Sequence, residues 1–106
     1  MKNSMITEFV KFKALETTTD EQLLTTAEQN VNGFHKKQEG FIDAELVKHV
    51  EENAWCFIFH YESMSHIMAV GQKMRQSREF GEFITLVEPQ SINATFFDHL
   101  RSWNGV

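Results

Sequence analysis

Alternation of apolar and polar positions predicts four strands along this chain, because successive side chains of a strand point to opposite faces. In the first, Ile6, Val10 and Phe12 lie on one side and Phe9 on the other. The four predicted strands cover Met5–Leu15, Phe41–Val50, Ala54–Glu62 and Gln90–Leu100. The second has one apolar side, formed by Ile42, Ala44, Leu46 and Val50. Its other side is mostly polar, which is typical of an edge strand.

The third predicted strand is apolar on both sides. One side is aromatic and consists of Trp55, Phe57, Phe59 and Tyr61, whereas the other consists of Cys56, Ile58 and His60. Neither side suits water, so this strand belongs in the middle of a sheet that is covered on both faces. The pattern leaves open which side the helices cover.

A segment whose apolar residues have helical spacing lies between the first two predicted strands. Leu23, Ala27, Val31 and Phe34 form a single apolar stripe after Thr17-Thr18-Thr19. Thr18-Asp20 with Glu21 fits a capping box at the start, and Gly40 fits the stop. Gly33 inside this helix indicates close packing.

A second helical region follows the third strand. Ser63 or Ser65 can cap it, and its inner face is predicted to contain Met64, Ile67, Gly71 and Met74, with Met68 and Val70 beside them. A further helical turn carries Phe80, Phe83 and Ile84 before Pro89 ends it. Residues 101–106 are predicted to be a tail.

This order of elements predicts an α+β, ferredoxin-like βαββαβ fold with a four-stranded antiparallel sheet. Both helical regions then cover the same face, and the first and third strands are central. The uncovered face is too apolar to meet water, so a second copy is expected to cover it. We therefore expect a homodimer formed through the sheet face.

Composition removes several functional classes. The chain has 106 residues, which predicts a single domain over residues 1–106, and its formal charge is −5. Without a basic stripe, binding to nucleic acid is not expected. No apolar run is long enough for a membrane span, no signal peptide is evident, and Cys56 is the only cysteine. These features favour the cytoplasm.

Two short motifs resemble the antibiotic biosynthesis monooxygenase-like domains of the dimeric α/β barrel superfamily. Gln38-Glu39-Gly40-Phe41-Ile42 is similar to their entry into the second strand, and Phe59-His60-Tyr61-Glu62-Ser63 to their exit from the third. The sequence departs from the family where Glu39 replaces a usual Pro and Tyr61 a frequent Trp. The haem-degrading branch uses an Asn on the first strand, and Glu8-Phe9-Val10 offers none, which disfavours haem chemistry.

The resemblance implies a pocket between the sheet and its own helices. Its substrate-binding residues are predicted to be Trp55, Phe57, Phe59, Met64, Met68 and Met74, and Ile67 is expected to help roof it. The Tyr61 hydroxyl is predicted to bind a phenol or carbonyl oxygen of a planar substrate. The alternative is that these same side chains simply form the core.

Histidine is the natural general base near neutral pH. His66, one turn into the second helix, and His99, near the end of the last strand, are the predicted bases, so the predicted catalytic residues are His66, His99 and Tyr61. The five histidines show no metal-ligand spacing, and no nucleotide motif is present, so neither a metal nor a cofactor is expected.

Three functions remain open. The first is a cofactor-independent monooxygenase, or a related small-molecule enzyme, that acts on a planar aromatic or polyketide-like compound. The second is a non-catalytic, ligand-binding or stress-related dimeric barrel, since this fold serves many functions. The third is an interaction domain that recruits another protein through its sheet, which is expected to purify as a monomer.

Overall fold

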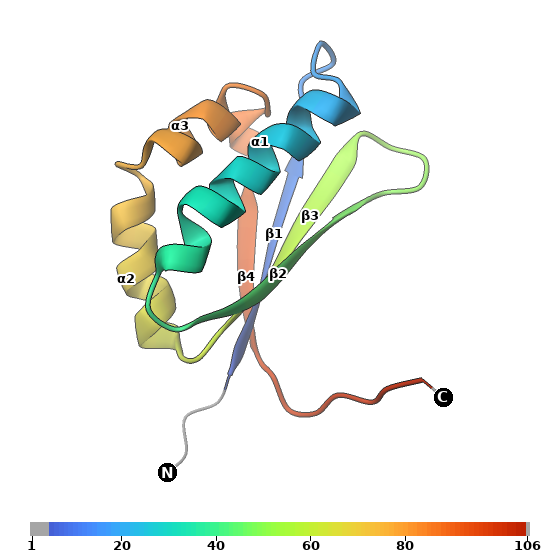
Figure 1. The fold of residues 1–106 in the computed structure, drawn as a ribbon. Helices are drawn as coiled ribbons and strands as arrows, with labels where there is room; N and C mark the ends of the chain where they lie inside the picture. Colours follow the sequence, from blue (N-terminus) through green and yellow to red (C-terminus); the bar gives the residue numbers. More distant parts are fainter. Residues whose placement is uncertain (1–4, 106) are drawn as a thin grey trace.

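The strands pair into one antiparallel sheet, with the three helices on one of its faces (Figure 1). The computed structural model describes residues 5–105. The strands are β1 (Ile6–Lys13), β2 (Phe41–Lys48), β3 (Ala54–Tyr61) and β4 (Asn93–Asp98), in the order β2-β3-β1-β4. The helices are α1 (Asp20–Gly33), α2 (Met64–Met74) and α3 (Arg78–Ile84), and 3-10 turns cover His35–Lys37 and Pro89–Ser91. The predicted α+β, ferredoxin-like arrangement is confirmed.

The aromatic side of β3 is the one that faces the helices. Trp55, Phe57, Phe59 and Tyr61 are all buried, whereas the intervening residues are partly exposed on the opposite face. We call this opposite face, with Phe9, Cys56, Ile58, His60 and Phe97, the open face. The structure thus settles a choice that alternation alone left undecided.

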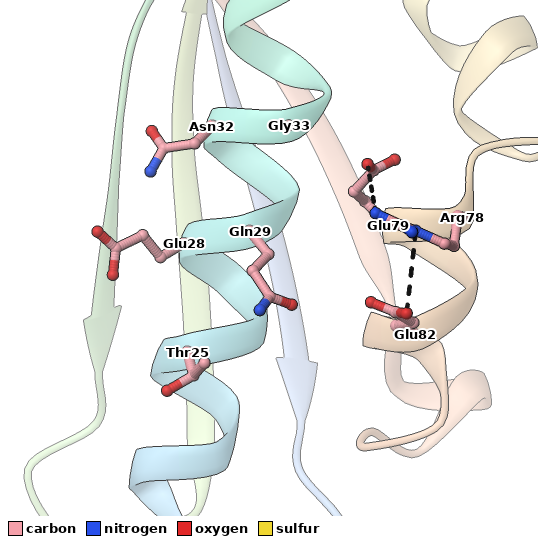
Figure 2. A pocket seen from close by; sticks show the side chains of 8 residues that line it. All are labelled: Thr25, Glu28, Gln29, Asn32, Gly33, Arg78, Glu79 and Glu82. Carbon is pink, nitrogen blue, oxygen red and sulfur yellow. Dashed lines mark ion pairs between the residues drawn. The ribbon is translucent and has the colours of Figure 1, made fainter.

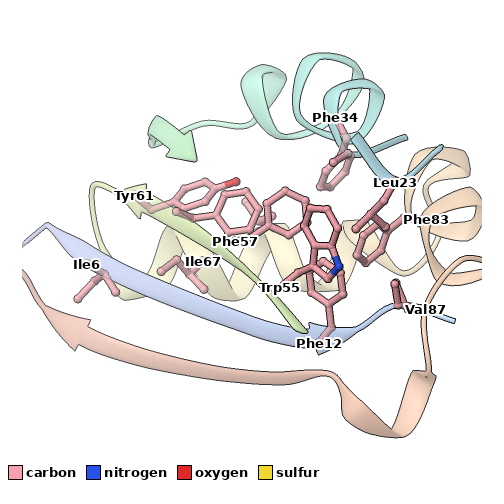
Figure 3. Packing of buried hydrophobic residues seen from close by; sticks show 14 residues of the cluster. Ile6, Phe12, Leu23, Phe34, Trp55, Phe57, Tyr61, Ile67, Phe83 and Val87 are labelled. Carbon is pink, nitrogen blue, oxygen red and sulfur yellow. The ribbon is translucent and has the colours of Figure 1, made fainter. Parts of the chain in front are cut away.

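Aromatic rings fill the layer between α1, α3 and the sheet (Figure 3). Phe12 meets Phe83 edge-on with ring centroids 5.0 Å apart, and Phe57 stacks on Phe59 at 5.1 Å. Phe57 and Phe59 are each only 3% exposed. Such offset and edge-to-face contacts stabilise aromatic pairs beyond their burial.

The start of α1 differs from the prediction by one residue. Thr19 is the N-cap: its hydroxyl accepts from the amide of Gln22, whose side-chain oxygen accepts from the amide of Thr19. Thr18 instead donates its hydroxyl to the carbonyl of Leu86. The predicted box of Thr18-Asp20 with Glu21 was wrong because the Thr18 hydroxyl is engaged by Leu86, so that Thr19 takes the cap position and Gln22, three residues later, completes the box.

The end of α1 also differs. The helix ends at Gly33, where an added Cβ would lie 3.0 Å from Glu79 Oε2 of α3, so the expected close packing is present. Gly40 does not end the helix but follows the 3-10 turn, and it has a φ of 88°. That left-handed conformation is one that glycine adopts without steric cost.

Helix α2 contacts the core through a narrower stripe than predicted. Ile67 and Val70 are buried, whereas Met68 is 63% exposed and Met64 is 37% exposed. The prediction that Met68 faces the sheet was wrong, because successive helix residues are rotated by about 100°. With Ile67 and Val70 inward, Met68 points away.

Two strands are also shorter or less regular than predicted. The pairing of β2 with β3 shifts register between Phe41 and Asp43, so Ile42 leaves the apolar face and is 43% exposed. Val50 lies in the turn after β2 and is 94% exposed. β4 covers only residues 93–98, because Pro89–Ser91 forms a 3-10 turn.

Candidate functional site

The fully buried Tyr61 has a specific partner under the helices. Its hydroxyl lies 2.8 Å from Nδ1 of His35, which the 3-10 turn after α1 places over the end of β3. The His35 ring stacks on Phe59 with centroids 4.3 Å apart and meets Phe34 edge-on. The two polar groups thus satisfy each other inside an aromatic enclosure.

Both members of this pair are neutral near pH 7. Burial lowers the pKa of His35 to about 4. Burial, and secondarily the negative charge of Glu8, raises the pKa of Tyr61 above its usual range. Because the pair is uncharged, it needs no counter-ion in the core.

Glu8 is a partly buried acidic residue on the helix side of the sheet. It pairs in register with Phe59 on β3 and Phe96 on β4, so its side chain points to the helix side. Glu8 is half-buried, and burial raises its pKa to about 7. Within residues 5–105 it forms no ion pair. A carboxyl poised near neutral pH is a candidate general base.

An apolar surface adjoins Glu8. Val10, two residues after Glu8 on the same side of β1, is half-buried. On β4, Ala94 pairs with Val10 and Phe96 pairs with Glu8. Both β4 residues are exposed, and the exposed fraction of Phe96 is 44%. We call Glu8, Val10, Ala94 and Phe96 the β4 shelf. A flat apolar molecule lying on the shelf would meet the Glu8 carboxyl before Tyr61, which is 0% exposed.

The predicted bases lie elsewhere. His66, in the first turn of α2, has Nδ1 2.7 Å from the Ser63 hydroxyl, and its ring packs against Gly40. His99 follows β4, with Nε2 2.9 Å from the Ser102 hydroxyl and its ring edge-on to His60 of the open face. The structure therefore does not bring His66 and His99 together with Tyr61.

The predicted substrate-binding residues also divide into groups. Trp55, Phe57 and Phe59 are buried in the core, where Trp55 donates its indole N–H to Asn53. Met74 is partly buried against that core. Met64 and Met68 are the exposed members. These side chains do not line a shared space.

The prediction from sequence missed two residues of this site, Glu8 and His35. Glu8 had a readable signal, because it interrupts the apolar alternation of Ile6, Val10 and Phe12 on a strand. His35 had a weaker signal, its place directly after the last apolar residue of the helical stripe. An acidic residue on an otherwise apolar strand face is expensive to bury, so it indicates function.

The β4 shelf is an exposed surface, whereas a hollow with a different character lies on the helix layer. Between α1 and α3 lies a hollow of about 630 Å³ with a polar lining (Figure 2). In it Arg78 pairs with Glu79 at 3.8 Å and Glu82 at 4.0 Å. Among residues 5–105, no group of three His, Cys, Asp or Glu side chains is arranged to hold a metal ion. No helix in that part of the chain is long and apolar enough to cross a membrane.

Comparison with known proteins identifies the fold but no close relative. No protein-family model matches the sequence, and no curated protein matches it significantly. Among solved structures, the cofactor-independent oxygenase SnoaB from Streptomyces nogalater is similar, with a TM-score of 0.71 and 12% identity over 93% of this chain and 96% of SnoaB.

Two further solved structures have a similar fold. A proposed monooxygenase from Shewanella loihica has a TM-score of 0.71 and 19% identity over 96% of this chain and 100% of its own. A proposed antibiotic biosynthesis monooxygenase from Nitrosomonas europaea has a TM-score of 0.68 and 11% identity, covering 94% of both chains. The chain thus has the fold of the antibiotic biosynthesis monooxygenase-like domains, as its two short motifs indicated.

Proposed function

We propose that this protein is a cofactor-independent monooxygenase, or a related small-molecule enzyme, that acts on a planar aromatic or polyketide-like compound at the β4 shelf. The observation that carries the proposal is Glu8, a half-buried carboxyl whose pKa burial raises to about 7. An efficient general base has a pKa near the working pH. The fold shared with SnoaB supports the same reaction class.

The chemistry starts with removal of a weakly acidic proton. Glu8 takes a proton from a phenol or from a ring CH₂ group flanked by aromatic rings, which leaves an electron-rich anion on the apolar surface. This anion reduces O₂ and combines with it to a hydroperoxide, which loses water. The balance is CH₂ + O₂ → C=O + H₂O, so the substrate supplies all the electrons and no cofactor is consumed.

Tyr61 and His35 act in this proposal as positioning residues. Tyr61 keeps its own proton at pH 7, and His35, whose pKa burial lowers to about 4, is too weak a base to compete with Glu8 for the substrate proton. Their bond ties the 3-10 turn after α1 to the end of β3, so the two polar groups satisfy each other in the otherwise apolar layer near Glu8. That apolar surrounding holds the pKa of Glu8 high.

We also propose that the protein is a homodimer formed through the open face. Phe9 and Phe97 meet edge-on there with centroids 5.5 Å apart, and Phe97 is 54% exposed. Ile58 lies beside Phe9 in register. An apolar patch of this kind is rarely left in water.

Oxygen uptake tests the enzymatic proposal. Purified protein is incubated with a panel of hydroxyanthrones and quinols, and uptake is expected with at least one and to rise as pH passes through about 7. Glu8→Gln is expected to lower the rate about 100-fold or more. The matched control Glu45→Gln, an exposed position on edge strand β2, is expected to keep the rate. Uptake with no compound, or equal rates for both variants, would contradict the proposal.

One observation favours the second function, a non-catalytic ligand-binding or stress-related barrel. The layer where a pocket was expected is packed with rings, and Phe57, Phe59 and Tyr61 are 3%, 3% and 0% exposed. Equilibrium dialysis separates the two functions. A compound that binds the native protein and Glu8→Gln alike, with no turnover by either, supports the binding module.

A further inference from the structure

A serine, a histidine and a glutamate form a chain of contacts at the start of α2. The Ser63 hydroxyl lies 2.7 Å from Nδ1 of His66, and Nε2 of the same ring lies 3.8 Å from a carboxylate oxygen of Glu39. Figure 1 shows the segment that leads into β2, which carries Glu39, beside the start of α2. We call these three residues the α2 triad. None of them belongs to the open face, which a second copy is proposed to cover.

The hydrogen bonds give the Ser63 proton one direction. The Glu39 carboxylate favours the His66 tautomer whose proton is on Nε2, so Nδ1 is left to accept the proton of the Ser63 hydroxyl. The Ser63 oxygen in turn accepts from the amide of His66 at 3.3 Å and lies 2.9 Å from the hydroxyl of Ser65. A nucleophile, a base and a group that orients the base therefore stand in the order typical of serine hydrolases.

Ser77 shows how a serine that only caps a helix is bonded in this fold. Its hydroxyl accepts from the amide of Phe80 at the start of α3, as Ser63 accepts at the start of α2. The Ser77 hydroxyl donates, however, to the carbonyl of Met74 at 2.8 Å, and a carbonyl cannot take the proton at neutral pH. The Ser63 proton instead meets an imidazole, which is a base near neutral pH. Capping thus explains the Ser63 hydroxyl but not its imidazole partner.

Gly40 holds the His66 ring in place. Its φ is 88°, and an added Cβ would lie 2.4 Å from Cγ of His66, so the ring packs directly on the backbone. The amide of Glu62 donates to the Gly40 carbonyl at 2.8 Å, which ties this backbone to the end of β3. The His66 side chain is 26% exposed. The base is therefore fixed on one side and reachable on the other, as a positioned catalytic group must be.

The start of α2 also offers donors for a developing negative charge. The amides of Met64 and Ser65 lie in the first turn, where the helix has no carbonyl for them. In other serine hydrolases the amide directly after the nucleophile is one of the donors that stabilise the oxyanion. The amide of Met64 follows Ser63 in the same way.

The surroundings of the α2 triad favour a neutral ester with an apolar leaving group. Met64 and Met68 are 37% and 63% exposed and lie one turn apart on α2, directly after Ser63. Glu39 and Glu62 are exposed acidic residues on the two segments that meet there. Because like charges repel, a substrate that carries a carboxylate is disfavoured. An uncharged aryl ester fits both the apolar and the acidic surroundings.

We propose that the α2 triad is a second reactive site, at which Ser63 hydrolyses small neutral aryl esters. His66 takes the Ser63 proton as Oγ bonds to the acyl carbon, and gives it to the leaving aryl oxygen as the ester C–O bond breaks. Water then attacks the acyl-serine with His66 as base, which releases a carboxylic acid and restores the hydroxyl. Glu39 is a positioning residue that holds the His66 tautomer. The site does not depend on the enzymatic proposal for the β4 shelf.

Two reagents test the α2 triad in the native protein. Release of nitrophenol from p-nitrophenyl acetate is expected to be catalytic and at least about tenfold faster than with the same concentration of free imidazole. Diisopropyl fluorophosphate is expected to stop this release, and mass spectrometry of the digested protein is expected to find its label on Ser63. Release no faster than with imidazole, or a label on another residue, would overturn the proposal.

Matched cap variants separate the nucleophile from the cap. Glycine is tolerated at a helix N-cap nearly as well as serine, so Ser63→Gly and Ser77→Gly are both expected to fold. Ser63→Gly is expected to lower the release rate at least about 100-fold and to abolish labelling, whereas Ser77→Gly keeps both. Equal rates for these two variants would mean that another group, such as His66 itself, is acylated, and the proposal would fail.

Two further variants test the base and its positioning residue. His66→Gln is expected to lower the release rate as much as Ser63→Gly, because both remove the same proton transfer. Glu39→Gln is expected to lower kcat about threefold at unchanged KM and unchanged thermal unfolding, since its carboxylate is largely exposed to water. Full activity of His66→Gln would overturn the role of the imidazole, and an unchanged kcat in Glu39→Gln would overturn that of the carboxylate.

Discussion

Glu8 and His35 are two ionisable residues on the helix side of one sheet, and folding shifts their pKa values in opposite directions. Burial raises the pKa of Glu8 to about 7 and lowers that of His35 to about 4. In both cases the fold disfavours the charged form, because the surrounding layer is apolar. Their effects on stability therefore oppose each other as pH changes.

The first prediction follows from this opposition. Glu8 binds its proton more tightly in the folded chain, so its contribution to stability falls as pH rises from about 4.5 to 7. His35 binds its proton less tightly, so its contribution falls as pH drops from about 6.5 to 4. Urea unfolding at several pH values is expected to show that the pH-dependent contributions of these two residues to the free energy of unfolding largely cancel between pH 4.5 and 6.5.

Single variants separate the pH dependence of stability that Glu8 causes from the one that His35 causes. Glu8→Gln is expected to be more stable than the native protein at pH 8 by about 1–2 kcal/mol, a value reduced for the partial exposure of Glu8. This variant loses stability on acidification below pH 6.5, whereas His35→Gln loses it as pH rises towards 7. Parallel pH profiles for the native protein and both variants would contradict the assignment.

The second prediction concerns the Tyr61–His35 bond. Tyr61→Phe removes the hydroxyl and leaves Nδ1 of a buried histidine without its partner, which costs about 1–3 kcal/mol of unfolding free energy. Tyr61→Phe/His35→Leu removes both polar groups and is expected to recover part of that loss. Denaturant unfolding measures both. A double variant whose loss equals the sum of the single losses would show that the two residues are uncoupled.

At the scale of elements, Gly40 and Gly71 have contrasting surroundings. Gly40 connects the 3-10 turn to β2 with a φ of 88°, and an added Cβ would lie 2.4 Å from the His66 ring. Gly71 lies in the middle of α2, and a Cβ there would meet nothing within 4 Å. The junction of β2 with α2 is therefore tightly constrained, whereas α2 leaves free space for a methyl group at Gly71.

The third prediction compares these two positions. Gly40→Ala is expected to lower the free energy of unfolding by at least about 2 kcal/mol, because the backbone becomes strained and the new Cβ clashes with His66. Gly71→Ala is expected to gain about 0.5–1 kcal/mol, because alanine is the better helix former. Thermal unfolding checks both, and Gly40→Ala/His66→Ala is expected to recover only the part due to the ring. Full recovery would mean that the positive φ costs nothing.

Element type could be predicted from sequence because periodicity extends over many residues. The double apolar alternation of β3 indicated a central strand, and the spacing of Leu23 and Ala27 indicated α1. Element ends depend on single contacts that periodicity does not encode. The bond of Thr18 to Leu86 shifts the α1 cap, and the register shift at Ile42 turns that side chain outward.

The site was harder to predict, because its residues meet only after the chain has folded. Tyr61 was predicted on the strength of its place at a strand end. His35 is 26 residues earlier, and only the 3-10 turn brings its Nδ1 within hydrogen-bond distance. The sequence does not distinguish the surroundings of His66 from those of His99. In the fold, the His66 ring packs against Gly40, whereas the His99 ring lies against His60 of the open face.

For the whole molecule, the open face raises the question of what covers it. The helices cover one side of the sheet only, and on the other side Phe97 is 54% exposed beside Phe9 and Ile58. The core under the helices is closed by its own side chains, so it needs no second chain. The open face is where association would bury further apolar area.

The fourth prediction tests association through this face. Native protein is expected to sediment at twice the chain mass of 12.4 kDa at micromolar concentration. Phe97→Glu places a charge in the centre of the apolar patch, where pairing with its twin across a two-fold axis would bury two like charges. This variant is expected to sediment as a single chain. Val50→Glu, in a turn where the side chain is 94% exposed, is the matched control and is expected to remain dimeric.

Circular dichroism shows whether Phe97→Glu is still folded, which is expected because the position lies outside the core cluster. A folded native chain that sediments at 12.4 kDa would instead favour a partner other than a second copy. If Phe97→Glu stays dimeric, the chains associate through another surface. In that case the patch around Phe97 would remain open to small ligands, and this part of the sheet would be a binding surface rather than a dimer interface.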